Sequence, residues 1–408
     1  MPSTSTQRLR DGVGQTSMII AINDLLVYGS AITRPTGIQR VASGLARELV
    51  ERFGARCVSV SESGMREVEL PSSSGASVAA RLAEPALRAL SKMPRSLQER
   101  ARGVARALLS IRARRVDGVA IRPVSGSWLL VLGAPWIAPG MAEAVRRSKE
   151  RDGVRVCLLI HDLLPATSQR WFADAQGRAA KDDIDTLIAA ADAIFTVSAE
   201  VATELETLYG KKATLLRPAD PQLQHAHENA LVDLPFAERT ILSVGTFHPR
   251  KNLAALVRIW DAWRDAPTLV LVGRRHPQDG EFFSVLAAHP SASERIRLIH
   301  TADDSQLADL YRACRFLVMP SLAEGWGLPI REALMAGRPS IATDAVPAAT
   351  GSPYATIVPA GDEAALSAAI HEWWESDAPE RLSEQIAREF APRSWSDVAA
   401  EVAAQLES

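Results

Sequence analysis

The stretch Glu324-Gly325-Trp326-Gly327-Leu328-Pro329-Ile330-Arg331-Glu332 places two carboxylates eight positions apart, with two glycines and a proline between them. The apolar run before it, residues 316–320, predicts a short buried strand. Pro329 suits the first turn of a helix, because its fixed φ fits there and its missing N–H would have no partner anyway. Gly337 predicts the end of that helix, and residues 339–343 predict another strand. The segment therefore reads as strand, glycine loop, short helix and strand.

The loop between the two glutamates can bind an anion. It presents backbone N–H groups and the positive end of a helix dipole, which suit a phosphate group. A carboxylate on either side can accept hydrogen bonds from hydroxyls, so the arrangement suits a nucleotide sugar. Glu324 would face the sugar and Glu332 the ribose, with the diphosphate between them. The alternative is an ordinary strand-to-helix turn with two solvated glutamates, because short motifs often match by chance.

With its flanking Gly-x-Gly-Leu-Pro, the pair resembles the signature of the retaining glycosyltransferases of family 4, also described as glycosyl transferases group 1. The resemblance implies the GT-B fold, an α/β architecture of two doubly wound Rossmann-like domains that face each other across a cleft. It implies that Glu324 contacts the donor sugar and Glu332 the ribose hydroxyls. By the same resemblance the donor site also includes Gly325, Trp326, Gly327 and Leu328.

Length and composition favour a two-domain soluble protein. At 408 residues the chain exceeds what one core usually supports, and its net charge is −2 with 47% hydrophobic residues. Residues 1–16 are polar, so we expect a flexible N-terminus without a signal peptide, and no stretch reaches the ~20 apolar residues of a membrane span. Cys57, Cys157 and Cys314 fit no metal spacing, which predicts reduced core thiols in a cytoplasmic protein.

Short apolar runs alternate with helical patterns along the chain, which predicts parallel sheets. We expect an acceptor-side domain over residues 17–216, an interdomain linker over 217–239 and a nucleotide-sugar-binding domain over 240–390. For residues 391–408 the resemblance implies a helix that packs back toward the first domain. The predicted strands are residues 18–22, 57–60, 128–132, 154–160, 193–197, 240–244, 268–272, 296–299, 315–319, 339–343 and 355–358.

The loop after predicted strand 240–244 carries the basic pair Arg250-Lys251. Breaking a sugar–phosphate bond leaves additional negative charge on the nucleoside diphosphate, and fixed cations can stabilise it without a metal ion. The resemblance implies this role for Arg250 and Lys251. Thr246 borders the same site and stands where many members of the family have an arginine. The alternative for the pair is two solvated surface cations.

Three further positions are assigned to the donor site by resemblance. His300 and Thr301 follow strand 296–299, in the loop that borders the base, although His300 fits an ordinary strand-end residue equally well. Gly37 lies before a predicted amphipathic helix, in the loop that borders the diphosphate and the acceptor. A lone glycine before a helix is also a common turn. Arg274 and Arg275 mark another edge expected near the nucleotide.

His161-Asp162, with Pro165 three residues after the aspartate, follows the apolar strand 154–160. It resembles a mannosyltransferase-like branch of family 4 in which the histidine lies close to the donor sugar and the reacting bond. A neutral imidazole can bond a sugar hydroxyl. The alternative is a strand-end cap whose ring bonds the backbone. Asp162 either orients His161 or caps the next turn, and we assign it no role as a catalytic base; Ser198 resembles a family position but also fits a helix N-cap.

Residues 81–115 hold ten Arg or Lys against two Glu, with leucines interleaved. Such a stretch either lies on an anionic membrane surface or forms helices with a solvated basic face. The net charge of −2 disfavours nucleic-acid binding. Asp183 and Asp185 formally match an Asp-x-Asp metal motif, but they fall in a helical pattern and read as surface charge. We therefore expect no metal and no other cofactor.

These observations predict a metal-independent hexosyltransferase that retains the anomeric configuration. The preferred donor is GDP-mannose, and the acceptor is a glycan or lipid-linked saccharide of a cell-surface polysaccharide such as lipopolysaccharide. We expect a cytoplasmic protein, with peripheral contact to the plasma membrane as an open option. The alternatives are a UDP- or dTDP-sugar of glucose, N-acetylglucosamine or rhamnose, or a non-catalytic homologue that binds nucleotide as a partner subunit. An epimerase or a glycogen-synthase-like polymerase fits the Glu324–Glu332 spacing less well.

Overall fold

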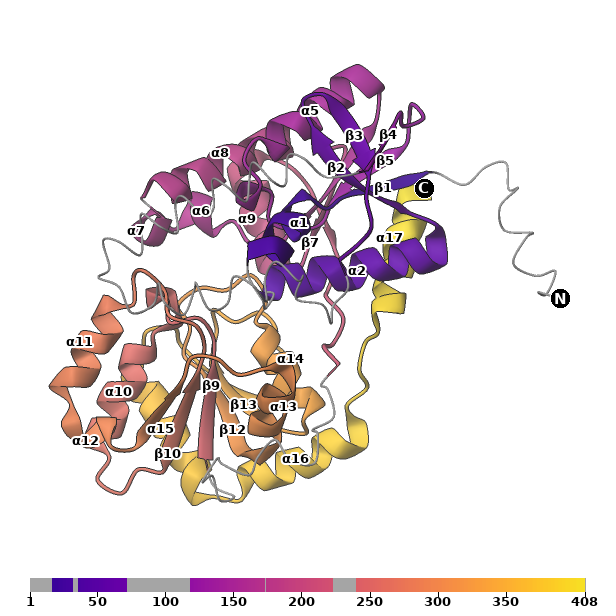
Figure 1. Ribbon diagram of the computed structural model, residues 1–408. Helices are drawn as coiled ribbons and strands as arrows, with labels where there is room; N and C mark the ends of the chain where they lie inside the picture. Colours follow the sequence, from indigo (N-terminus) through magenta and orange to yellow (C-terminus); the bar gives the residue numbers. More distant parts are fainter. Residues whose placement is uncertain (1–16, 32–35, 72–117, 173, 223–239, 408) are drawn as a thin grey trace.

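Two sheets, each covered by helices on both faces, organise the protein (Figure 1). The computed structural model describes residues 17–31, 36–71, 118–172, 174–222 and 240–407. The expected flexible N-terminus, most of the expected linker and the basic stretch 81–115 lie outside the described residues. We refer to the first sheet with its helices as the first lobe, and to the second sheet with its helices as the second lobe.

The first sheet has the strand order β4-β3-β2-β1-β5-β6-β7-β8. Its pairs are parallel from β2 to β8, whereas β3 and β4 pair in antiparallel fashion at one edge. The strands β3, β4 and β8 are additions to the predicted set. The strands are β1 (Met18–Ala21), β2 (Arg56–Ser61), β3 (Gly64–Glu67), β4 (Val119–Ile121), β5 (Trp128–Val131), β6 (Arg155–Ile160), β7 (Ala193–Thr196) and β8 (Thr214–Leu215).

The second sheet is parallel throughout, with the order β11-β10-β9-β12-β13-β14. All of its strands were predicted, and their bounds differ from the prediction by at most one residue. They are β9 (Thr240–Val244), β10 (Thr268–Val272), β11 (Ile296–Ile299), β12 (Cys314–Met319), β13 (Ser340–Thr343) and β14 (Ala355–Val358). Parallel strands buried on both faces read as continuous apolar runs, which explains why the sequence reveals them.

Each sheet contains one place where the strand order changes direction. That place lies between β9 and β12 in the second sheet and between β1 and β5 in the first. Crevices in parallel sheets open beyond the carboxyl ends of the strands at such points, and ligands bind there. The loops after these strands therefore form the expected binding region.

Helices cover both faces of each sheet (Figure 1). The first lobe contains α1 (Asn23–Ala31), α2 (Gly37–Phe53), the 3-10 turn η1 (Pro135–Ile137), α5 (Met141–Asp152), α6 (Leu164–Thr167), α7 (Gln169–Phe172), α8 (Ala175–Ala190) and α9 (Ala199–Tyr209). The second contains η2 (Pro249–Lys251), α10 (Leu253–Ala262), α11 (Gly280–Ala288), α12 (Pro290–Ser293), α13 (Asp304–Ala313), α14 (Leu328–Met335), α15 (Glu363–Glu375) and α16 (Ala378–Glu389). Among the described residues, no helix is both long and apolar enough to span a bilayer.

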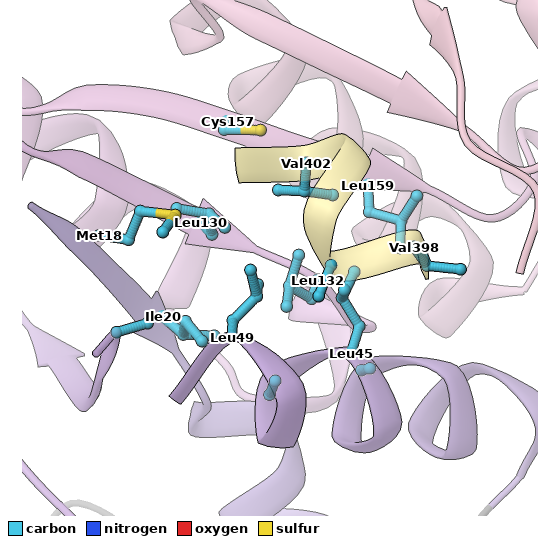
Figure 2. Packing of buried hydrophobic residues seen from close by; sticks show 14 of the residues in the cluster. Met18, Ile20, Leu45, Leu49, Leu130, Leu132, Cys157, Leu159, Val398 and Val402 are labelled. Carbon is cyan, nitrogen blue, oxygen red and sulfur yellow. The ribbon is translucent and has the colours of Figure 1, made fainter. Parts of the chain in front are cut away.

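The final helix, α17 (Trp395–Glu407), belongs to the core of the first lobe although it follows the whole second sheet. Figure 2 shows Val398 and Val402 of α17 beside Leu45 and Leu49 of α2. The buried indole N–H of Trp128 in β5 donates to the carbonyl of α17 residue 406 at 2.9 Å. Burial of these apolar side chains, at about 25 cal/mol per Å², anchors α17 on the first sheet.

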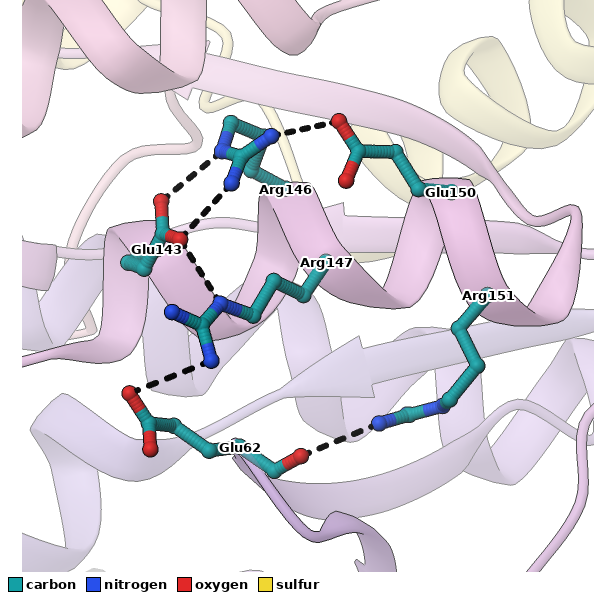
Figure 3. A network of polar contacts seen from close by, with 6 residues as sticks. All are labelled: Glu62, Glu143, Arg146, Arg147, Glu150 and Arg151. Carbon is teal, nitrogen blue, oxygen red and sulfur yellow. Dashed lines mark hydrogen bonds and ion pairs between the residues drawn. The ribbon is translucent and has the colours of Figure 1, made fainter.

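The outer face of α5 is a solvated ionic surface. Glu143 accepts hydrogen bonds from Arg146 and Arg147, and Arg147 also pairs with Glu62 (Figure 3). These side chains are 37–70% exposed, so solvent screens their pairing.

Candidate active site

A cavity of about 470 Å³ lies between the lobes, lined by loops that follow β1, β6, β9, β10, β11 and β12. Its volume falls within the ~300–1,000 Å³ typical of small-molecule sites. The lining includes most of the residues predicted for the site. These are Gly37, His161, Thr246, Arg250, Lys251, His300, Glu324, Gly325, Trp326, Gly327, Leu328 and Glu332.

Thr301 is the exception among the predicted donor-site residues. It is exposed and does not line the cavity, whereas its neighbours His300 and Ala302 do. The side chains of consecutive residues in an extended segment point in opposite directions, so two lining residues place the one between them outside. Asp304, at the start of α13, lines the cavity instead, although sequence analysis assigns it no role.

Glu324 holds the basic pair in place. Its Oε2 accepts from the Arg250 guanidinium at 2.6 Å, and its Oε1 accepts from Lys251 Nζ and, at 2.8 Å, from the Ser321 hydroxyl. The side chains of Arg250 and Lys251 are only 22% and 10% exposed. Neither is a solvated surface cation, so that alternative does not hold. Arg250 is also anchored at 2.9 Å on the carbonyl of residue 323.

This burial shapes the charge of the cluster. Burial by itself would raise the pKa of Glu324, but the charges of Arg250 and Lys251 and their hydrogen bonds hold that pKa at about 2. Burial lowers the pKa of Lys251 from its ordinary value, against the opposing effect of Glu324. At neutral pH Glu324 is therefore an ionised carboxylate shared between two cations.

Glu332 is buried, lines the same cavity and has two partners. The Arg40 guanidinium of α2 donates to its Oε1, and the Tyr311 hydroxyl donates to its Oε2 at 2.6 Å. Burial first, and then the charge of Glu332, raise the pKa of Tyr311, so this phenol stays protonated. Sequence analysis assigns Arg40 and Tyr311 no role. Arg40 could have been predicted from its spacing to Gly37. It lies three positions after that glycine and therefore on the same face of the helix.

His161 combines the two roles considered for it. Its Nε2 lies 2.8 Å from the carbonyl of Leu132, as expected for a strand-end cap, and the residue also lines the cavity. Because a carbonyl only accepts, Nε2 carries the proton and Nδ1 keeps its lone pair. Burial lowers the pKa of His161 to about 4, so the ring is neutral at pH 7. A neutral ring of this tautomer can accept a hydrogen bond from a hydroxyl.

Asp162 and Ser198, the other two residues considered with His161, each cap a local turn or helix. Asp162 Oδ1 accepts from the N–H of Leu164 at 3.2 Å, which caps the following turn. Burial raises the pKa of Asp162, and Asp162 lines the cavity as well. Ser198 accepts from the N–H of Val201 and is the N-cap of α9.

Two glycines bring the lobes together at the cavity. An ideal Cβ at Gly325 would stand 1.8 Å from the carbonyl oxygen of His161, and one at Gly37 would stand 3.1 Å from Leu328 Cδ1. Gly327, with φ +109°, adopts a left-handed backbone directly before α14, whose first residues Leu328 and Pro329 line the cavity. The loop between the two glutamates thus approaches both elements of the first lobe.

The residues expected near the base occupy different positions at the cavity. His300 Nδ1 lies 3.2 Å from the carbonyl of Gly273, and its ring contacts Phe247 at 5.1 Å between centroids. His300 is therefore a strand-end residue that also lines the cavity. Arg274 lines the cavity, while Arg275 instead pairs with Asp279 at 2.7 Å.

Within the described residues, no group of three or more His, Cys, Asp or Glu side chains is arranged to hold a metal ion. Asp185 lies on α8 and pairs with Lys181 and Tyr209, as expected of helix surface charge. The three cysteines are buried free thiols, as predicted. The arrangement in the cavity is thus one of fixed cations, carboxylates and backbone N–H groups.

Residues 238–376 match the family described as Glycosyl transferases group 1. The serotype-specific mannosyltransferase WbdA of Escherichia coli is 27% identical over 214 residues, which cover 47% of this chain and 26% of that protein. The O-antigen chain mannosyltransferase B of Escherichia coli is 34% identical over 107 residues, 25% of this chain and 28% of that protein. The chain thus spans about a quarter of the length of these relatives.

Solved structures match over almost the whole chain. HepE from Anabaena, in complex with UDP-glucose, covers 96% of this chain and 99% of its own at a TM-score of 0.61 and 15% identity. Sucrose-phosphate synthase from Thermosynechococcus elongatus covers 96% and 98% at a TM-score of 0.60 and 18% identity. At these identities the likeness establishes the fold. The chain therefore has the predicted GT-B fold and carries, in its second lobe, a domain of the family Glycosyl transferases group 1.

Proposed function

We propose that the protein is a retaining glycosyltransferase that moves a hexose from a nucleotide sugar to an acceptor hydroxyl. One observation carries the proposal. Arg250 and Lys251 are held on Glu324 in the same cavity that Glu332 lines. One cavity thus combines cations suited to a diphosphate with two carboxylates suited to sugar and ribose hydroxyls.

In the proposed reaction the bond between the anomeric carbon and the phosphate oxygen breaks, while the acceptor oxygen bonds the same face of that carbon. The acceptor proton passes to the departing phosphate oxygen, so no protein nucleophile is required. Arg250 and Lys251 stabilise the charge on the leaving diphosphate because they are fixed cations in a water-poor site. Their presence makes a metal ion unnecessary.

The remaining residues orient the sugar. Glu324 can accept from a sugar hydroxyl with the acceptor position that Arg250, Lys251 and Ser321 leave open, since a carboxylate has about four such positions. The neutral ring of His161 offers Nδ1 as another acceptor beside the reacting bond. Both residues then bind the sugar without a charge change during the reaction.

We propose mannose from GDP-mannose as the donor, because the two curated relatives described above are named mannosyltransferases. A UDP-sugar is the alternative, since HepE was solved with UDP-glucose. The O-antigen assignment of one relative supports a glycan or lipid-linked acceptor. On this basis we place the protein in the cytoplasm.

The test is a thermal-shift and hydrolysis panel of the purified protein with GDP-, UDP-, dTDP- and ADP-sugars in EDTA. A Tm increase with one nucleotide, together with slow release of its sugar, would support the proposal and identify the donor. Dependence of hydrolysis on added metal would contradict the metal-independent mechanism. A Tm increase without hydrolysis or transfer to any acceptor would favour a nucleotide-binding partner subunit.

A further inference from the structure

Arg40 joins the two lobes across the cavity. It extends from α2 in the first lobe, and its guanidinium donates to Oε1 of Glu332 on α14 in the second. The Glu332 side chain is 3% exposed and that of Arg40 is 29% exposed. Glu332 is thus fixed and buried, with Tyr311 on its other oxygen, while Arg40 reaches it through the cavity that both residues line.

The charges of the cavity lining balance before a ligand enters. Glu324 already pairs with Arg250 and Lys251, and Glu332 already pairs with Arg40. A nucleoside diphosphate sugar brings two negative charges, so its binding favours the release of a cation from one of these carboxylates. The charged lining residues are Arg40, Arg250, Lys251 and Arg274 against Asp162, Asp304, Glu324 and Glu332.

Glu332 is the carboxylate that a ligand can most directly take over. Ribose hydroxyls donate hydrogen bonds, as Arg40 does now, so a ribose on Glu332 replaces Arg40 at Oε1. Tyr311 keeps the other oxygen in place during this exchange. A guanidinium left without an acceptor in a partly buried site is unfavourable, and phosphate oxygens match its planar fork.

The position of Arg40 allows this change of partner. Gly37, one helical turn earlier on the same face of α2, lies against Leu328 at the first turn of α14. That turn lines the cavity, and we assign the diphosphate to its positive helix end. Arg40 therefore lies between the ribose carboxylate and the phosphate site, within the reach of one long side chain.

We propose that Arg40 is a donor-binding residue that leaves Glu332 for the diphosphate when the ribose occupies Glu332. The inference rests on the proposed function, since it requires a nucleoside diphosphate donor. Because Arg40 belongs to the first lobe and the donor binds the second, the exchange also ties the lobes together around the donor. Arg40 then recognises the phosphates rather than the nucleoside.

The test compares ligands that differ only in their phosphates. Calorimetric titrations of the nucleoside, monophosphate and diphosphate are made on the wild type, Arg40→Ala and Arg40→Lys. Arg52→Ala is the matched control, because Arg52 lies on the same helix in an exposed pair with Glu48. We expect Arg40→Ala to weaken diphosphate binding roughly 10- to 100-fold, the effect of a charge-assisted hydrogen bond. Nucleoside affinity should stay equal or rise, because Glu332 is then unoccupied.

Arg40→Lys keeps the charge without the fork, so its diphosphate affinity should fall between those of Arg40→Ala and the wild type. The ratio of diphosphate to nucleoside affinity is read on one preparation, which makes it independent of the folded fraction. If Arg40→Ala weakens nucleoside and diphosphate binding equally, the affinity ratio does not change. That result would mean that Arg40 only orders Glu332, and it would overturn the inference. Wild-type protein that binds no nucleotide would overturn the proposed function together with it.

Discussion

The carbonyl oxygen of His161 lies so close to Gly325 that position 325 has no room for a side chain, since an ideal Cβ would stand 1.8 Å from that oxygen. The two residues come from different lobes, one after β6 and the other after β12. Their contact therefore sets how closely the sugar side of the first lobe approaches the glycine loop of the second.

Gly325→Ala should separate the two lobes at this point. The added methyl group must push the His161 loop away, and misplacement of about 1 Å near reacting groups can lower the rate by up to ~100-fold. We expect kcat/KM to fall at least about tenfold, with a small change in Tm. Gly280→Ala is the control, because a Cβ there meets nothing within 4 Å. Wild-type kinetics in Gly325→Ala would contradict the close approach.

Glu324→Gln should separate phosphate binding from transfer. The resemblance implies that Glu324 contacts the donor sugar, and in the structure Glu324 is also the shared partner of Arg250 and Lys251. We therefore expect Glu324→Gln to lose transfer, to unfold at lower temperature, and to bind nucleoside diphosphate more tightly than the wild type. Titration and transfer assays on the same preparation measure these effects. Weaker diphosphate binding would show that Glu324 does not compete with phosphate.

Asp220 should be a stability determinant between the lobes. It is buried, and it accepts from Arg331 at 2.9 Å and from the N–H of Arg393 at 2.7 Å. Asp220→Asn leaves a partly buried guanidinium without its charged partner, which typically costs about 3–5 kcal/mol. We expect a Tm lowered by about 3–6 °C, measured by calorimetry. Asp377→Asn, in an exposed pair, should change Tm by much less.

His161 should make stability fall in mild acid. Its folded pKa of about 4 lies below the ordinary value of 6.5, so the unfolded chain binds more protons below pH 6.5. Stability that is present above pH 6.5 is thus lost as the pH falls toward 4. Between pH 7.5 and 5, urea denaturation should show the wild type losing about 2 kcal/mol more than His161→Gln, whose amide can still donate to Leu132. Parallel curves would contradict a buried neutral ring.

The strands of the second sheet could be predicted because burial on both faces leaves an unbroken apolar run, as in β10. The edge strands β3 and β4 have no such pattern. Only Met65 is buried in β3, and Val119 of β4 is 74% exposed. These two strands form because they pair with neighbouring strands in the folded sheet. The local pattern of apolar residues therefore does not predict them.

Arg250, Glu324 and His161 were assigned from motifs that resemble those of the family. Each also follows a strand, and topology brings such residues to one edge of the sheet, so all three line the cavity as assigned. Arg40 was not assigned, because its partner Glu332 lies 292 residues away on the other lobe. Thr301 was placed in the site because the loop after β11 was assigned as a whole. The direction of each side chain in that loop was not considered, and Thr301 is exposed.

The placement of α17 has a consequence for synthesis on the ribosome. The second lobe is continuous in sequence, whereas the first lobe takes α17 from beyond it. The nascent first lobe must therefore leave the apolar side chains that α17 packs against, including Leu45 and Leu49 of α2, without this cover until residues 395–407 emerge. By then the second lobe has been translated in full, so we expect it to fold before the first lobe is complete.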